Sequence, residues 1–115
     1  MVDYDCGSIP VVEDQQGRKL VGMITDRDIT CRTVAMGRNP LEMKVQECMT
    51  VPVDYIDQDA DMDEVVHLME QKAVRRVPVV DPDGGCCGIV SQADIAAGAP
   101  KVDTADVVRV ISLAA

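Results

Sequence analysis

Two short segments of the chain place a hydroxyl side chain three residues before a carboxylate. They are "GMITDRDI" at 22–29, with Thr25 and Asp28, and "GIVSQADI" at 88–95, with Ser91 and Asp94. This spacing is the capping-box pattern, in which both side chains bind free backbone N–H groups at the start of a helix. We therefore expect one helix to begin at Thr25 and another at Ser91.

The same arrangement also has a functional interpretation. A helix N-terminus presents N–H groups and positive partial charge, which suits a phosphate. A nearby carboxylate can accept hydrogen bonds from the two hydroxyls of a ribose. Capping is the simpler interpretation of a single copy, but both copies keep the hydroxyl, the carboxylate and a glycine three residues before the hydroxyl. The repetition therefore favours a nucleotide site.

The similarity extends upstream of the two motifs. The segment "SIPVVEDQQGRKLVGMITDRDI" (8–29) parallels "RVPVVDPDGGCCGIVSQADI" (76–95), which indicates an internal duplication. Each copy predicts a strand, a turn that contains glycine, a second strand and a helix. The turns differ in length by two residues, and an even difference keeps the same strand face inward.

Further elements are expected before the second copy. Residues 51–56, "VPVDYI", alternate like a strand, and residues 61–74 show the periodicity of an amphipathic helix. The apolar face of this helix is expected to hold Met62, Val65, Val66 and Met69. The second copy is thus predicted as a β-α-β-β-α unit, whose leading strand lies parallel to the next strand through a right-handed crossover. Only six residues precede Gly7, so the first copy lacks the leading strand and helix.

Strand-like Val and Ile runs alternate with helix-like stretches, which predicts a mixed α/β (α+β) fold with an aliphatic core. The organisation that we expect is one compact domain in four parts. They are a partial first unit at 1–36, a linker at 37–48, a complete second unit at 49–99 and a C-terminal helix at 100–115.

The duplicated pattern G-h-h-[ST]-x-x-D after h-P-V-V, where h is an aliphatic residue, resembles the cystathionine beta-synthase (CBS) domain pair, or Bateman module. The resemblance covers residues 6–97. It implies tandem β-α-β-β-α units that pack sheet to sheet with pseudo-twofold symmetry. It also implies two clefts for adenosine-containing ligands, in which no bond is made or broken.

The resemblance further implies which residues would form the clefts. The first cleft would use Thr25, Asp28, Thr50, Val53, Val74, Arg75 and Arg76. The second would use Ser91 and Asp94 with Gly7 and Ser8, but the missing leading strand leaves its other wall incomplete. Arg75 and Arg76 could offset the field of an acidic protein around a polyphosphate, or they could form a solvated strand edge.

Two classes of function remain open. One is a regulatory module that senses AMP, ADP, ATP, S-adenosylmethionine or NAD(H), with no obligatory cofactor. The other is a dimerisation scaffold that has lost ligand binding. The missing elements leave an apolar sheet face around Ile9, Val11 and Ile24. We therefore expect a homodimer, in which the tail helix or a second chain covers this face.

Charge and hydropathy argue against several other partners. The formal net charge of −9 is spread along the chain, so the surface should repel nucleic acid and anionic membranes. There is no basic segment followed by an apolar run at the N-terminus, and no apolar stretch long enough to span a membrane. We expect a cytoplasmic protein.

The sequence shows no catalytic or metal-binding constellation. It lacks a G-x-S-x-G motif, and its single histidine, His67, is expected on the exposed side of a helix. We therefore expect no enzymatic activity. The cysteines lack the C-x-x-C or histidine spacing of a zinc site and are expected to be reduced: Cys6, Cys31, Cys48, Cys86 and Cys87. The adjacent Cys86 and Cys87 could form a redox pair or occupy an ordinary hairpin position.

Overall fold

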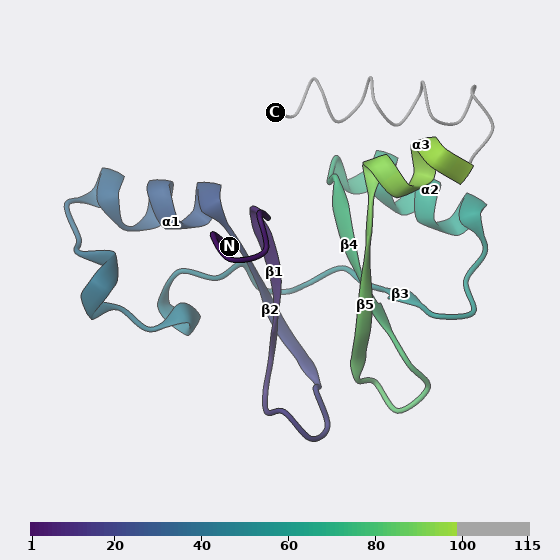
Figure 1. The fold of residues 1–115 in the computed structure, drawn as a ribbon, viewed down its shortest axis with the longest axis horizontal. Coiled ribbons are helices and arrows are strands. Elements are labelled where there is room, and N and C mark those ends of the chain that lie inside the picture. The colour runs from purple at the N-terminus through teal and green to yellow at the C-terminus, as the bar shows by residue number, and fades with distance from the viewer. Residues whose placement is uncertain (99–115) are drawn as a thin grey trace. The chain divides into compact units, whose positions relative to one another are not determined.

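The computed structural model describes residues 1–98, so the predicted C-terminal helix at 100–115 lies outside the described residues. Its helices and strands follow the order β-β-α and then β-α-β-β-α (Figure 1). The chain divides into two compact units, Met1–Val53 and the part from Asp54 onward, called below the first and the second unit. The mixed α+β class predicted from the sequence is confirmed.

The first unit is built on a β-hairpin. Strand β1 (Ser8–Val12) pairs antiparallel with β2 (Leu20–Thr25), and helix α1 (Asp26–Arg32) follows at once (Figure 1). The carboxylate of Asp14 orders the turn by accepting hydrogen bonds from the N–H groups of Gln16 and Gly17, at 3.0 and 2.8 Å. The predicted strand, turn, strand and helix are therefore present.

The second unit repeats this hairpin and adds a strand and a helix before it. Strand β4 (Arg76–Val80) pairs antiparallel with β5 (Cys86–Ser91), and α3 (Gln92–Gly98) follows. Strand β3 (Ile56–Asp57) precedes α2 (Met62–Lys72) and pairs parallel with β4, so the sheet order is β3-β4-β5. The parallel pairing expected from the crossover is confirmed.

The two hairpins share their register as well as their order. Val11 lies opposite Gly22 in the first, and Val79 lies opposite Gly88 in the second. The register of each hairpin shifts at the next residue, Val12 or Val80, as at a β-bulge. The different turn lengths therefore leave the strand faces equivalent, as the even difference predicted.

The core of the second unit is aliphatic and lies between α2, the hairpin and α3. Its buried members are Val65, Val66, Met69, Val77 and Ile95. Full burial of one such side chain stabilises a fold by about 1.5–3 kcal/mol. Met62 was predicted on the same helix face but is 40% exposed. Burial begins at Val65, so the first turn of α2 stays at the surface.

The strand predicted at 51–56 is wrong in its extent. Only Ile56 and Asp57 pair with β4, whereas Thr50 forms an isolated antiparallel bridge with Met23 of β2. Pro52, between these two pairings, has no N–H to donate to a sheet. The segment therefore pairs with the first unit at Thr50 and with the second unit at Ile56.

Helix α1 ends at Arg32. A 3₁₀ turn, Val34–Met36, follows, and Gly37 stops it in the left-handed conformation with φ 74°. Two further 3₁₀ turns, Pro40–Glu42 and Val45–Glu47, occupy the segment expected to be a plain linker.

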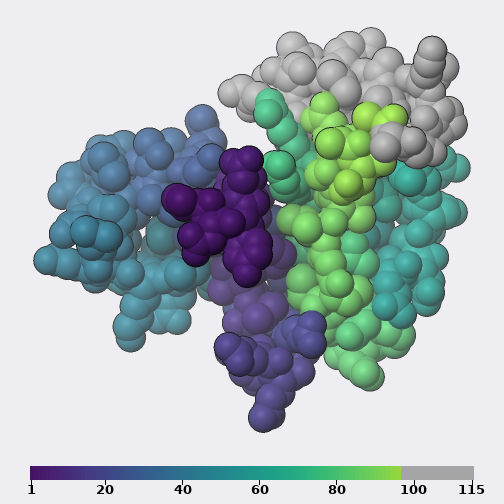
Figure 2. Space-filling view, in the orientation of Figure 1, coloured from purple at the N-terminus to yellow at the C-terminus, as the bar shows by residue number. Residues whose placement is uncertain are grey.

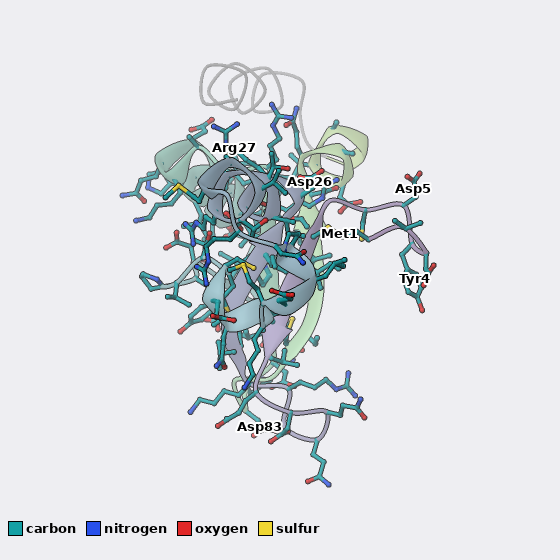
Figure 3. All side chains as sticks on the ribbon, turned by 90° about the vertical axis from the view of Figure 1, so that its left-hand side faces the viewer. Met1, Tyr4, Asp5, Asp26, Arg27 and Asp83 are labelled. Atoms are coloured by element: carbon teal, nitrogen blue, oxygen red, sulfur yellow. The ribbon has the colours of Figure 1, made fainter. Side chains whose placement is uncertain are left out.

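The N-terminal turn before β1 presents its side chains at the surface of the first unit. Figure 2 shows these residues in purple, and Tyr4 and Asp5 project outward in Figure 3. Tyr4 is 87% exposed and Val2 94% exposed. Ile24, expected on an uncovered sheet face, is instead buried at 7% exposure, while Ile9 and Val11 are half-buried.

Ala73 ends α2 in the left-handed conformation, with φ 53° and ψ 45°, where a Cβ costs about 1 kcal/mol. We expect Ala73→Gly to raise the free energy of unfolding by about 0.5–1 kcal/mol, measured by urea denaturation. The matched control is Ala96→Gly inside α3, which should lower the same free energy by about 0.5–1 kcal/mol. Destabilisation by both substitutions would contradict the role of the αL position.

Candidate functional site

Helix α1 begins at the first motif with the predicted capping box. Thr25 is the N-cap residue, in extended conformation, and its hydroxyl accepts a hydrogen bond from the N–H of Asp28 at 3.0 Å. The Asp28 carboxylate accepts one in return from the N–H of Thr25, also at 3.0 Å. The capping interpretation is thus confirmed, and it fixes the Asp28 carboxylate beside the end of β2.

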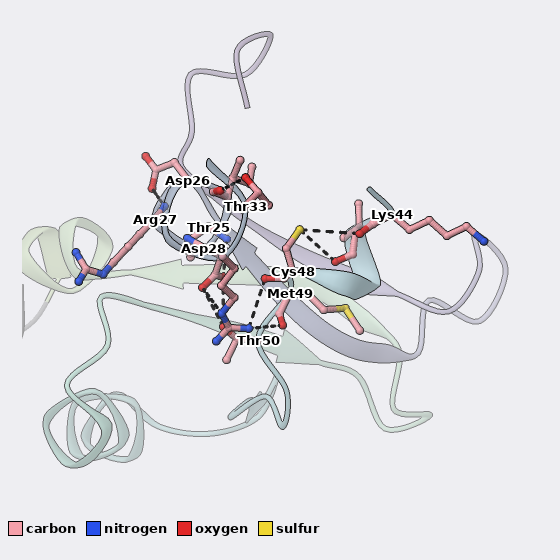
Figure 4. Close-up of polar contacts among 12 residues, drawn as sticks. Thr25, Asp26, Arg27, Asp28, Thr33, Lys44, Cys48, Met49 and Thr50 are labelled. Carbon is pink, nitrogen blue, oxygen red and sulfur yellow. Dashed lines mark hydrogen bonds and ion pairs between the residues drawn. The ribbon is translucent and has the colours of Figure 1, made fainter. Parts of the chain in front are cut away.

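Thr50 reaches the same carboxylate from a distant part of the chain. Its hydroxyl lies 3.2 Å from each oxygen of Asp28, a residue 22 positions earlier (Figure 4). Its backbone is held on β2, because the N–H of Thr50 donates to the carbonyl of Met23 at 2.7 Å and the carbonyl of Thr50 accepts from the N–H of Met23 at 3.1 Å. The structure therefore brings together three predicted site residues, Thr25, Asp28 and Thr50.

Arg32 also belongs to this cluster, although the sequence analysis missed it. Its Nη1 donates to the carbonyl of Met49 at 2.7 Å, and its Nε lies 3.9 Å from Asp28 Oδ1. Arg32 follows Asp28 by four residues, a spacing that places two side chains on one helix face. The ion pair could have been predicted from that spacing, but no nearby sequence pattern indicated the hydrogen bond to Met49.

The glycine of the first motif has a packing role. A Cβ added to Gly22 would overlap Met49 Sδ and lie 3.0 Å from its Cγ, so Met49 rests directly on the backbone of β2. At Gly88 an added Cβ would meet no atom of the described residues within 4 Å. A side chain at this glycine position would therefore force Met49 to shift in the first unit, whereas at Gly88 it would meet no described residue.

The backbone donors proposed for a phosphate are already engaged in α1. The N–H of Asp26 donates to the carbonyl of Gly7 at 2.9 Å, and that of Arg27 to the Asp26 carboxylate at 2.8 Å. The N–H of Asp28 is bound by Thr25. The expectation of free N–H groups at this helix start was therefore wrong, because the chain before β1 and the first turn itself occupy them.

The second motif forms its own capping box at the start of α3. The N–H and the hydroxyl of Ser91 donate to Asp94 Oδ2 at 2.8 and 2.9 Å, and the N–H of Asp94 donates to the Ser91 hydroxyl at 3.2 Å. These Ser91 hydrogen bonds, first from the backbone and then from the side chain, lower the pKa of Asp94. The charge of Arg76, which lies opposite Ser91 across the hairpin, lowers the pKa further.

The remaining predicted site residues are divided between the two units. In the first unit, the carbonyl of Gly7 accepts a hydrogen bond from the first residue of α1, Ser8 lies opposite Thr25, and Val53 is half-buried. In the second unit, Val74 is half-buried, while Arg75 and Arg76 are exposed. Each of the two clefts implied by the resemblance would combine residues of both units, and both clefts stay predictions.

Residues 1–98 contain no cluster of three or more His, Cys, Asp or Glu side chains that could hold a metal ion. Within this part of the chain, no helix has the length and hydropathy needed to cross a membrane. His67 is exposed on α2, as expected, and all five cysteines are free thiols.

Comparison with known sequences gives a consistent result. The sequence model of the CBS domain matches residues 1–32 and 45–100. An uncharacterized protein of Methanopyrus kandleri is 36% identical over 95 residues, which are 83% of this chain and 47% of that protein. Hypoxic response protein 1 of Mycobacterium tuberculosis is 37% identical over 101 residues, 88% of this chain and 68% of that protein. The chain thus spans about half to two thirds of the length of these relatives.

Solved structures show the same likeness. The crystal structure of Hypoxic Response Protein I with two coordinated zinc ions has a TM-score of 0.76 and 38% identity, covering 87% of this chain and 78% of that one. A CBS domain pair in complex with 5′-methylthioadenosine and S-adenosyl-L-methionine has a TM-score of 0.69 and 32% identity. That match covers 84% of this chain and 72% of the other.

The hydrogen bonds at Asp94 lead to a pH-dependent stability. Because its pKa is lowered from the usual 3.8, Asp94 stabilises the folded state above pH 3.8, and this contribution is lost as the pH falls through the lowered pKa. We expect the Asp94 carboxyl to titrate below pH 3.8 by NMR. Ser91→Ala should raise the titration midpoint of Asp94 part of the way towards 3.8, since the backbone N–H of residue 91 still donates to the carboxylate. An unchanged midpoint would rule out the side-chain contribution.

Proposed function

We propose a non-catalytic, ligand-binding role for this chain, which belongs to the CBS domain family. The ligand that we propose is an adenosine-containing compound, such as AMP, ADP, ATP, S-adenosylmethionine or NAD(H), bound at Asp28 of the first unit. The observation that carries the proposal is the convergence of Thr25 and Thr50 on the Asp28 carboxylate.

The chemistry of this cluster suits a ribose better than a phosphate. An ionised carboxylate only accepts hydrogen bonds, and the two hydroxyls of a ribose are donors at matching spacing. The Asp28 side chain is 14% exposed, so it is largely buried but still reaches solvent. The N–H groups in the first turn of α1 already donate hydrogen bonds, so they are not free to bind a phosphate at this helix start.

The likeness to a ligand-bound CBS domain pair supports the same ligand class. Both compounds in that complex carry an adenosine ribose, and neither carries a phosphate. In a module without a catalytic group, such a ligand acts by favouring the conformation that it binds best. We therefore propose that adenosine-ligand occupancy at Asp28 is the signal that this chain transmits to a partner.

Thermal shift measurements test the proposal. Adenosine, AMP, ATP and S-adenosylmethionine should be tried, and at 100 times its Kd a ligand should stabilise the native state by about 2.7 kcal/mol. Asp28→Ala should abolish the response, because it removes the ribose acceptor. The matched control is Asp61→Ala, which removes the N-cap carboxylate of α2 that binds the N–H of Glu64 at 3.0 Å. This variant should lose similar stability and keep the response.

Two outcomes would contradict this function. If no ligand at millimolar concentration shifts the melting of the wild type, the chain is not an adenosine sensor. If the response survives Asp28→Ala but disappears in Asp94→Ala, the ligand binds at the second motif instead.

A second candidate function, a homodimerising scaffold, is favoured by exposed aliphatic side chains on the first unit. Val34, Met36 and Leu41, on two neighbouring 3₁₀ turns, are 61%, 70% and 92% exposed. Large aliphatic side chains gathered on a surface are typical of interaction sites. We propose that two copies of this chain associate through these turns.

Light scattering tests this association. The wild type should have the mass of a dimer, and Leu41→Glu should reduce it to a monomer, because a charge buried in an apolar contact is unfavourable. Val2→Glu, at a side chain that is 94% exposed outside these turns, is the control and should remain dimeric. A monomeric wild type at high concentration would exclude the scaffold.

A further inference from the structure

Both oxygens of the Asp28 carboxylate already accept hydrogen bonds within the first unit. Oδ2 accepts hydrogen bonds from the N–H of Thr25 at 3.0 Å and from the hydroxyl of Thr50 at 3.2 Å. Oδ1 accepts from the same Thr50 hydroxyl at 3.2 Å. A hydroxyl has one proton, so Thr50 bridges the two oxygens with a single shared donor. A ribose diol that binds both oxygens from the side where this hydroxyl bridges them would need the position of this hydroxyl.

Thr50 cannot leave this position by moving its backbone without breaking other contacts. Two backbone hydrogen bonds to Met23, at 2.7 and 3.1 Å, hold it on β2. The preceding carbonyl, that of Met49, is held by Arg32 at 2.7 Å (Figure 4). Rotation of the side chain about χ1 is the remaining movement, and it carries the hydroxyl from one staggered position to another. The contact can therefore open while the surrounding frame stays in place.

We infer that Thr50 competes with the ligand for Asp28 and thereby determines which ligands bind; this inference rests on the proposed function. A ligand with two vicinal ribose hydroxyls breaks one shared hydrogen bond and forms two. A ligand with a single hydroxyl breaks one and forms one, so it gains nothing from the carboxylate. The site therefore requires an intact ribose diol and disfavours 2′-deoxy ligands and ligands phosphorylated at the 2′ or 3′ oxygen.

This role differs from the one expected from the family resemblance, in which Thr50 helps to hold the ligand. The two roles predict opposite effects of removing the hydroxyl. A competitor stabilises the empty protein and weakens binding, so its loss lowers stability and raises affinity. A ligand contact strengthens binding, so its loss lowers affinity.

Thr50→Val removes the hydroxyl and keeps the branched shape of the side chain. By isothermal titration with adenosine, we expect its affinity to rise about threefold to tenfold, the value of one ordinary hydrogen bond. Binding of 2′-deoxyadenosine should rise by a similar factor from a level at least about tenfold weaker than that of adenosine. The urea midpoint of the variant should fall in the same samples. Thr30→Val, an exposed position on α1, is the matched control and should change neither affinity.

The outcomes separate this inference from the proposed function. If the wild type binds adenosine and Thr50→Val binds it equally or more weakly, Thr50 is not a competitor, while the adenosine site itself stands. If Thr50→Val binds adenosine and the wild type binds no ligand, Thr50 blocks Asp28 completely, and the proposed function of the wild type fails. If neither protein binds adenosine, S-adenosylmethionine or AMP, the proposed function fails and this inference fails with it.

Discussion

The carboxylate of Asp28 is the interaction on which the first unit depends. It caps α1 through Thr25, receives the hydroxyl of Thr50 and lies beside the guanidinium of Arg32. These contacts join the end of β2, the first turn of α1 and a segment 22 residues later. A charged acceptor makes stronger hydrogen bonds than a neutral one, so one side chain can hold three segments together. The same property makes the carboxylate suitable for a ligand that donates hydrogen bonds.

In the second unit, the same motif has no hydrogen-bond donor equivalent to Thr50 among the described residues. Ser91 and Asp94 form the same capping box, but the Ser91 hydroxyl itself donates to the carboxylate, and Asp94 is exposed. No described residue from outside the motif donates a hydrogen bond to Asp94. Gly88 likewise lacks the close neighbour that Gly22 has in Met49. Two sequence segments with the same pattern thus differ in their potential for ligand binding, because Met49 and Thr50 contact the first of them.

Local patterns predicted most of the fold. The hairpins, both capping boxes and the parallel crossover follow from turn residues, alternation and the spacing of hydroxyl and carboxylate. What could not be predicted depended on distant partners. Of the strand expected at 51–56, only Ile56 pairs with β4, whereas Thr50, just before it, pairs with Met23. The α1 donor expected to be free is bound by the carbonyl of Gly7. The reach of Arg32 to Met49 is of the same kind, because no sequence spacing encodes it.

The hydrogen bonds between Met23 and Thr50 also determine which backbone groups lie at the outer edge of β1. Both backbone groups of Met23 face Thr50, so the opposite residue, Pro10, directs its backbone away from β2. Proline has no N–H, and the register shift beyond Val11 interrupts the ladder further. A short edge that carries a proline and a bulge is a poor template for strand addition by another chain. The first sheet is thereby protected at this edge against aggregation through its backbone.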